Sequence, residues 1–309
     1  MTNLRFNDVR VMLADSRTHI RNTLKTALSH AGLENIEHAA RLDQVAEGLD
    51  QGLGPDILIC DIGLEGGDTC AAIDAIRHHE MGRNPFLCIL GITWNPTETE
   101  VDRAINSGID LLVAAPMSPG QILNRLESLV RNRLPWVVTG DYVGPDRRKR
   151  LERAQNLPLM QVPNTLKEKT MGTWDPQRLR SEIAHAISDV SARKIERQAA
   201  DVTQLADMIV AQSALPGPTM VRAHMDRLYT LVVGLDRRSE QRGFGHISEL
   251  CRACVGIVEK MRSSDGAVAD KDMQLLKHLA MAIRTAMDPS SGAESIAHDI
   301  ARTVIGAGR

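Results

Sequence analysis

The chain has 309 residues, of which 43% are hydrophobic and 25% charged, and its formal net charge is −2. This composition is typical of a globular protein large enough for two domains. It excludes a strongly basic protein that binds nucleic acid through phosphate contacts, and no apolar run approaches the roughly 18 residues of a membrane span.

The N-terminus and the cysteines both favour a cytoplasmic protein. The segment from Met1 to Arg5 does not open an apolar signal-peptide core. The 5 cysteines stand at irregular spacing, and an odd count indicates reduced thiols rather than a disulfide framework. Because only 3% of the residues are aromatic, aliphatic and methionine side chains are expected to fill the core.

Residues 1–134 alternate predicted strands and helices, and they carry 12 basic and 18 acidic side chains. Short apolar runs predict strands, and apolar residues three and four apart predict helices. The predicted strands cover 9–14, 35–40, 57–60, 86–92 and 111–113, and the predicted helices cover 17–31, 42–53, 69–81, 97–107 and 118–132. Ser118 is the expected N-cap of the last of these helices. The alternation predicts an α/β fold with a doubly wound, five-stranded parallel sheet.

Polar residues follow several of the predicted strands. In a doubly wound parallel sheet the functional crevice lies at the carboxyl ends of the strands. The residues that fall there are Asp15, Asp61, Thr93 and the Ala115–Pro116 turn. Clustered carboxylates can hold Mg2+, which prefers oxygen ligands, and a carboxylate can also accept a phosphoryl group as a nucleophile.

The order and spacing of these landmarks resemble the receiver domain of two-component response regulators. The segments that carry the resemblance are Val11-Met12-Leu13-Ala14-Asp15, Pro55 to Leu64, Ile89-Leu90-Gly91-Ile92-Thr93, Ser107-Gly108-Ile109-Asp110 and Leu112-Val113-Ala114-Ala115-Pro116. The resemblance implies that Asp61 is the phosphoacceptor, that Asp15 and Asp61 form an acidic Mg2+ site, and that Thr93 is the switch hydroxyl.

Two positions depart from the pattern of that family. Ser16 stands where the family has a second acid, and it weakens the implied Mg2+ site because it carries no formal charge. Ala115 stands where the family has a lysine, so its side chain cannot pair with a phosphoryl oxygen. By analogy with the loss of a transition-state donor, such a contact is worth about 2–4 kcal/mol. Both a receiver phosphorylated on Asp61 and a pseudo-receiver without phosphoryl chemistry remain open.

Residues 135–172 contain four prolines and carry 7 basic and 4 acidic side chains, which favours an extended linker. Within the run from Asp141 to Arg150, the segment from Tyr142 to Arg148 is similar to a tail found in some bacterial receiver proteins. Its basic side chains could dock on an acidic face of the first domain, grip an anionic ligand or remain solvated. A cyclic-dinucleotide site is disfavoured because the expected downstream Asp-x-Ser-x-x-Gly element is absent.

Residues 173–309 predict an all-helical bundle for output or dimerisation. Asp175 followed by Pro176 marks a helix start, with Asp175 as the N-cap. The apolar stripe that follows fits either one helix of roughly 55 Å or two shorter ones. Further helical patterns cover 219–241, 246–262, 270–287 and 293–305.

The predicted bundle offers few candidates for chemistry. His246 and His278 are candidates for a phosphotransfer relay, although neither is followed by the Lys-Gly that is usual in that family. Cys251 and Cys254 are three residues apart on an apolar stripe, where packing is favoured over a metal or redox role.

Together these features predict a cytoplasmic, non-enzymatic response regulator of two-component phosphorelay signalling, whose atypical receiver acts through protein–protein contacts. The expected partners are a sensor histidine kinase or phosphotransfer protein, a downstream protein and, as one alternative, a second copy of the chain. No nucleic acid, no membrane and no cofactor other than Mg2+ is expected. The alternative functions are a phosphorylation-independent pseudo-receiver scaffold and a histidine phosphotransfer relay in the helical domain.

Overall fold

The computed structural model of the chain describes residues 4–148, 157–213, 218–263 and 269–287. The chain forms two compact units, Met1–Val190 and Ser191–Arg309. The division falls inside one long helix, whereas the sequence pattern places the start of the second domain at residue 173. The difference arises because the first half of that helix buries Ile183 and Ala186 in an apolar cluster with Phe86 and Trp136 of the first unit.

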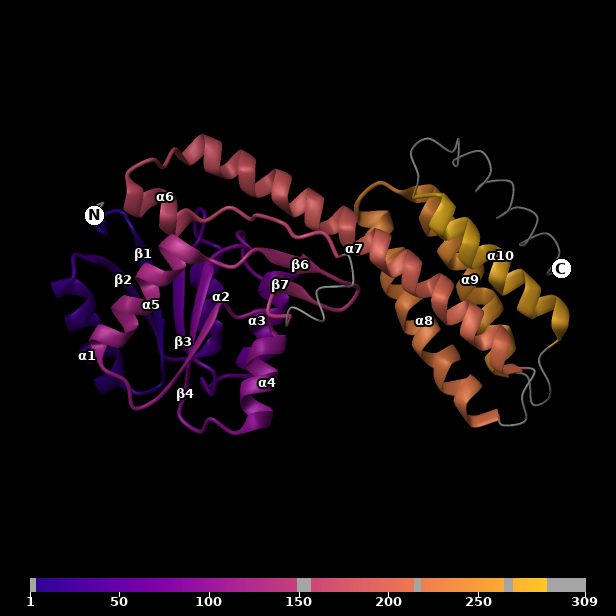
Figure 1. Cartoon of the computed structure of the whole chain (residues 1–309), viewed down its shortest axis with the longest axis horizontal. Helices are drawn as coiled ribbons and strands as arrows, with labels where there is room; N and C mark the ends of the chain where they lie inside the picture. Colours follow the sequence, from indigo (N-terminus) through magenta and orange to yellow (C-terminus); the bar gives the residue numbers. More distant parts are fainter. Residues whose placement is uncertain (1–3, 149–156, 214–217, 264–268, 288–309) are drawn as a thin grey trace. The chain divides into compact units, whose positions relative to one another are not determined.

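The first unit is built on a five-stranded parallel sheet with the strand order β2-β1-β3-β4-β5 (Figure 1). The strands are β1 Arg10–Ala14, β2 Asn35–Ala39, β3 Ile57–Asp61, β4 Cys88–Thr93 and β5 Leu111–Ala114. Every residue of β3 and β4 is buried, as expected for central strands that are covered on both faces. The doubly wound, five-stranded sheet predicted from the sequence is therefore confirmed.

Helices cover both faces of this sheet. They are α1 Thr18–His30, α2 Leu42–Leu49, α3 Thr69–Arg77, α4 Glu98–Asn106 and α5 Pro119–Asn132. Leu24 of α1 and Leu126 of α5 belong to the apolar cluster on one face, and Leu49 of α2 and Ile76 of α3 belong to the cluster on the other. Ser118 caps α5 with a complete capping box, as its sequence context predicts.

The described residues of the segment 135–172 fold as part of the first unit, which corrects the interpretation of this segment as an extended linker. Its elements are β6 Trp136–Val138, β7 Val143–Pro145 and α6 Thr165–Met171. β6 and β7 form an antiparallel two-stranded sheet. Trp136 is fully buried, and its ring centroid lies 5.3 Å from that of Phe86. Burial of so large an aromatic side chain outweighs the tendency of the neighbouring prolines to keep the chain extended.

Helix α6 is attached to the first unit by polar contacts at both of its ends. Asn164 caps its N-terminus and donates from Nδ2 to the backbone carbonyl of Leu129 at 3.0 Å. Near the C-terminus, Lys169 Nζ lies 2.8 Å from the buried carboxylate of Asp56. Because both side chains of this ion pair are largely shielded from water, the pair is screened much less than a surface pair.

The segment from Tyr142 to Arg148 also makes polar contacts within the first unit. Arg147 donates from Nη2 to the backbone carbonyls of Ile109 and Asp110 at 2.5 and 2.6 Å. Arg148 forms an ion pair with Asp146 at 2.8 Å, and this Asp146 is 1% exposed. These two arginines are therefore bonded within the unit and only partly exposed to solvent, while Lys149 and Arg150 lie outside the described residues.

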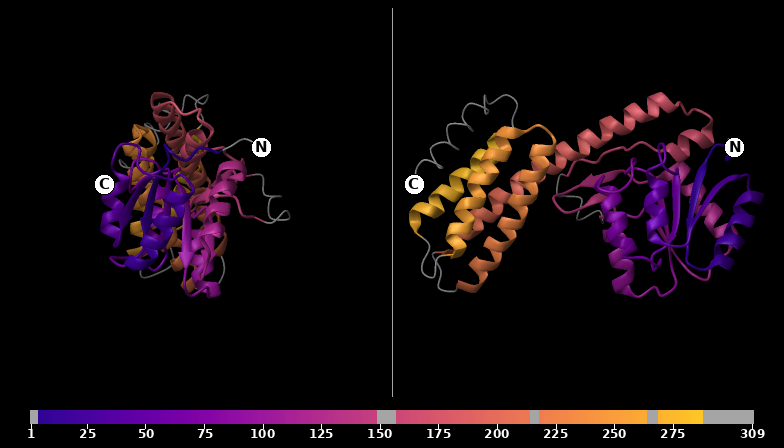
Figure 2. Two further views of the ribbon diagram at one scale, coloured as in Figure 1. Left: turned by 90° about the vertical axis from the view of Figure 1, so that its left-hand side faces the viewer. Right: turned by 180° about the vertical axis from the view of Figure 1, so that it is seen from behind.

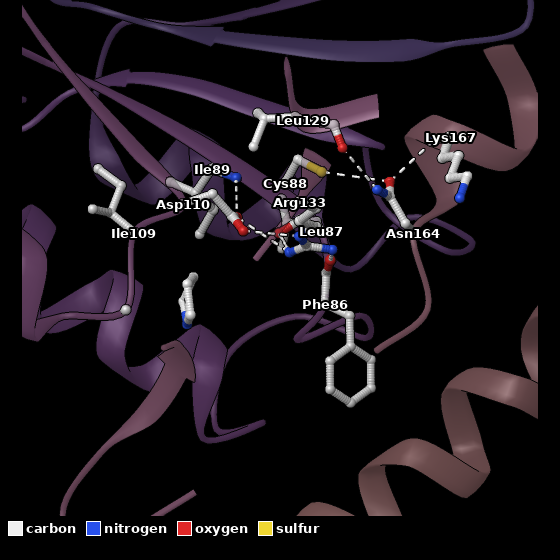
Figure 3. Close-up of polar contacts among 12 residues, drawn as sticks. Phe86, Leu87, Cys88, Ile89, Ile109, Asp110, Leu129, Arg133, Asn164 and Lys167 are labelled. Carbon is white, nitrogen blue, oxygen red and sulfur yellow. Dashed lines mark hydrogen bonds and ion pairs between the residues drawn. The ribbon is translucent and has the colours of Figure 1, made fainter. Parts of the chain in front are cut away.

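A buried ion network links the sheet to the segment that follows α5 (Figure 3). Asp110 accepts hydrogen bonds from Arg77 Nη2 and from Arg133 Nε, both at 2.8 Å. The side chains of all three residues are at most 6% exposed. Figure 3 shows Arg133 between Asp110 and the backbone of Phe86, whose carbonyl oxygen it meets at 2.7 Å. Two cations and one anion are thus buried together, and backbone carbonyls satisfy the remaining donors.

The second unit is helical throughout its described residues, as predicted (Figure 2). Its helices are the second half of α7 Pro176–Ser213, then α8 Pro218–Gln241, α9 Gly245–Ser263 and α10 Asp270–Thr285. α7 is one continuous helix, and Asp175 caps it by accepting the Gln177 N–H at 2.8 Å. The predicted helix over 293–305 lies outside the described residues. In the described part of the chain, no helix combines the length and apolar character that a membrane crossing requires.

Candidate functional site

The carboxyl edge of the sheet gathers the residues that the sequence pattern singled out. Asp15 directly follows β1, and Asp61 and Thr93 are the last residues of β3 and β4. Because these three strands are adjacent and parallel, their ends meet at the same edge. Asp15, Asp61 and Thr93 are 2%, 7% and 1% exposed, so two carboxylates and a hydroxyl are buried side by side at this edge.

An arginine that the sequence analysis missed joins the two carboxylates. Arg17 donates from Nε to Asp15 Oδ1 and from Nη2 to Asp15 Oδ2, each at 2.8 Å. The same Nη2 atom also contacts Asp61 Oδ2. Arg17 precedes α1, and its backbone N–H donates to Asp15 Oδ1 at 2.8 Å. One guanidinium therefore bridges both acids, with a bidentate contact to Asp15 and a single contact to Asp61.

Trp94 covers the other side of this guanidinium. The Arg17 Cζ atom lies 3.9 Å from the centroid of the Trp94 ring, which is the geometry of a cation–π contact. Trp94 is 41% exposed, so it shields the guanidinium while remaining in contact with solvent. A tryptophan directly after Thr93 and a basic residue two positions after Asp15 are the sequence signals that could have indicated this pairing.

Burial and charge act in opposite directions on the acids of this pocket. Burial raises the pKa of Asp61, while the Gly63 N–H, which lies 3.0 Å from Asp61 Oδ1, and the charge of Arg17 oppose the increase. The net result is a pKa above the ordinary value. Hydrogen bonding to Asp15 raises the pKa of Arg17, and this keeps its guanidinium charged.

The two positions that depart from the receiver pattern also lie at this edge. Ser16 stands between Asp15 and Arg17 in the chain and supplies no second carboxylate. Ala115 follows β5, and its backbone N–H donates to the Thr93 carbonyl oxygen at 2.8 Å. The lysine position of the receiver pattern is thus adjacent to Thr93, but its side chain is a methyl group that offers no positive charge.

The donor set of the pocket does not fit Mg2+ as it stands. Mg2+ needs oxygen ligands at about 2.0–2.1 Å, and usually takes them from one or two carboxylates and several waters. Asp15 and Asp61 are ligands of the right type, but all four of their carboxylate oxygens accept hydrogen bonds from Arg17 or from Gly63. Among the described residues, no group of three or more His, Cys, Asp or Glu side chains could hold a metal ion.

In the second unit, the candidate histidines and cysteines form no metal-binding group among the described residues. His246 Nε2 lies 3.3 Å from the Ala286 carbonyl oxygen, and His278 is exposed. Cys251 and Cys254 are fully buried free thiols in the apolar core, where burial raises the pKa of both. Burial on the packed face of α9 supports the packing role that their spacing predicts.

Comparison with known families gives one match. Residues 11–127 match the family model of the response regulator receiver domain. That range contains the residues of the acidic pocket. It also contains all five strands of the parallel sheet, except for Arg10 at the start of β1. No curated protein matches the chain.

Similar solved structures cover about two fifths of the chain. The chemotaxis response regulator CheY4 of Vibrio cholerae is 21% identical, with 39% of this chain and 98% of that chain covered and a TM-score of 0.35. The isolated REC domain of RcsB from Salmonella enterica serovar Typhimurium is 20% identical, with 41% and 91% covered and a TM-score of 0.36. The signal receiver domain of a DNA-binding response regulator (merR) from Colwellia psychrerythraea 34H is 16% identical, with 40% and 100% covered and a TM-score of 0.37.

Proposed function

We propose that this chain, whose residues 11–127 form a response-regulator receiver domain, is an atypical response regulator that acts through protein–protein contacts. Its receiver would accept a signal from a sensor histidine kinase or a phosphotransfer protein. Its helical unit would pass the signal to a downstream protein or to a second copy of the chain. The balanced charge of the chain gives no support to a nucleic-acid partner, and a cytoplasmic location fits this role.

The observation that carries this proposal is the position of Asp61. Its carboxylate ends the central strand β3 at the edge where Asp15 and Thr93 also lie. A carboxylate in such a pocket is a nucleophile for a phosphoryl group, and a neighbouring hydroxyl can stabilise the product. In the proposed roles, Asp61 is the phosphoacceptor, Asp15 is its acidic neighbour and Thr93 is the switch hydroxyl. Phosphorylation would act by favouring one of two conformations through different contacts in each.

A second candidate function is a pseudo-receiver that binds its partners without phosphorylation. Three features of the pocket favour it: Arg17 already pairs with both acids, Ser16 replaces a ligand and Ala115 replaces the cation. In that case the receiver fold would serve as a constitutive docking module, and Asp61 would be a structural partner of Arg17.

A small phosphodonor distinguishes the two candidates. We expect the full-length protein, incubated with acetyl phosphate, to gain the mass of one phosphoryl group, and we expect Asp61→Asn to lose essentially all of this label. The label should be removed by hydroxylamine, because it is an acyl phosphate. Asp68→Asn is the matched control, since Asp68 caps α3 at the surface and should be labelled like the wild type.

Each other outcome identifies a different function. Absence of label from the wild type would support the pseudo-receiver. Label that persists in Asp61→Asn and is labile in acid but stable in base would indicate a phosphohistidine, and therefore a relay in the helical unit.

A further inference from the structure

The acidic pocket contains its own cation. Arg17 engages both oxygens of Asp15 and one oxygen of Asp61, and the Gly63 N–H engages the fourth carboxylate oxygen. Two carboxylates this close together repel each other strongly in a buried setting, so a positive charge between them is needed. The guanidinium of Arg17 meets that need from within the chain.

Three contacts hold this cation in place. The backbone N–H of Arg17 is bonded to Asp15, the side chain returns to the same carboxylate, and Trp94 stacks on the open side of the guanidinium. The neighbouring Arg21 points its Nη1 atom at the Asp15 backbone carbonyl and not at either carboxylate. The position between the acids is therefore specific to Arg17, although a second basic side chain is close by.

A divalent ion cannot share this position with the guanidinium. An ion at about 2 Å from the carboxylate oxygens would stand where the N–H donors of Arg17 lie, and the two positive charges would repel each other at short range. We propose that Arg17 is the resident cation of the receiver pocket, that it excludes Mg2+ from Asp15 and Asp61, and that its removal opens a divalent-cation site on these two carboxylates. This proposal deepens the proposed function by assigning the charge balance of the same pocket.

Mg2+ titration of the full-length protein tests the proposal, with tryptophan fluorescence and calorimetry as readouts. For the wild type we expect no saturable response to millimolar MgCl2. For Arg17→Ala we expect saturable binding at least about tenfold tighter than any binding to the wild type, because a charge at the ion's position has been removed. Arg17→Met is the second variant, since it keeps an aliphatic stem against Trp94 while removing the charge.

Arg21→Ala is the matched control, because it removes an adjacent positive charge without freeing either carboxylate. It should behave like the wild type. Equal Mg2+ affinity in the wild type and the Arg17 variants would overturn the proposal. So would the absence of binding in all of them, because Arg17 would then not be the group that excludes the ion. These titrations contain no phosphodonor. They therefore test the role of Arg17 even if acetyl phosphate does not label Asp61.

Discussion

Asp110→Ala is expected to lower the free energy of unfolding of the first unit by about 3–5 kcal/mol. Asp110 is 3% exposed and is the only described carboxylate bonded to Arg77 and Arg133, whose side chains are 0% and 6% exposed. Its removal would leave two guanidinium groups buried together without a counter-charge. It would also remove the acceptor for the Ile89 N–H, which lies 2.8 Å from Asp110 Oδ2.

Tryptophan fluorescence during urea unfolding measures this effect for one unit alone, because Trp94, Trp136 and Trp174 all lie in residues 1–190. Asp43→Ala is the control, since Asp43 pairs with Arg41 at the surface and such pairs contribute about 0–1 kcal/mol. A loss below about 1 kcal/mol for Asp110→Ala would show that the network does not hold the first unit together.

The Asp110 network also predicts a pH dependence. Burial alone would raise the pKa of Asp110, but the charges of Arg133 and Arg77 outweigh it and hold the pKa below its ordinary value. A carboxyl with a lowered pKa in the folded state stabilises the fold above its unfolded pKa, and this contribution is lost as the pH falls through the folded pKa. The difference between the wild type and Asp110→Ala should therefore be present at neutral pH and diminish in acid.

Cys60, Cys88 and Cys254 should react with iodoacetamide about a thousand times more slowly in the native protein than in the unfolded chain. Burial raises the pKa of Cys60, Cys88 and Cys254 to about 12, against an ordinary value of 9.0, and it raises the pKa of Cys251 as well. The thiolate is the reactive form, and at pH 8 its fraction falls about tenfold for each unit by which the pKa rises.

Mass spectrometry after labelling at pH 8 measures this protection site by site, and the unfolded chain in urea should take up 5 labels. Rapid native labelling of Cys251 or Cys254 would revive the redox or metal role for that pair. The same shifts imply that stability declines in alkali, because above the ordinary thiol pKa the unfolded chain releases protons that the folded chain retains.

The parallel sheet could be predicted from the sequence because its signals are local. Apolar runs that end in Asp15, Asp61 and Thr93 mark three of its strands, and glycines mark several helix ends. The boundaries were less accurate: α2 was expected to reach Leu53 but ends at Leu49, where a loop with glycines at positive φ begins. Such end effects depend on the packing of the following loop and not on apolar periodicity.

The attachment of the segment 135–172 could not be predicted because its partners are distant in sequence. Trp136 is buried against Phe86 and beneath Arg77 and Arg133, and none of these contacts has a periodic signature. Arginine is mostly exposed in proteins, so composition gives no reason to expect buried guanidinium groups. They are buried here because Asp110 and a set of backbone carbonyls converge on them.

The sequence predicted only some of the residues of the acidic pocket. The carboxyl ends of parallel strands meet, so Asp15, Asp61 and Thr93 were expected at one edge, and the structure brings them together there. Arg17 was missed because the receiver pattern directs attention to the acid position that Ser16 occupies. The sequence also does not show the direction of the Arg17 side chain, which turns back over Asp15 and reaches Asp61.

A crystal structure of the full-length protein grown in Mg2+ tests the occupancy of this pocket most directly. We predict that the Arg17 guanidinium will lie between Asp15 and Asp61 beneath Trp94, with no metal ion on either carboxylate. A metal ion bound to Asp61 with Arg17 turned away, or the two carboxylates at separate edges of the sheet, would contradict this.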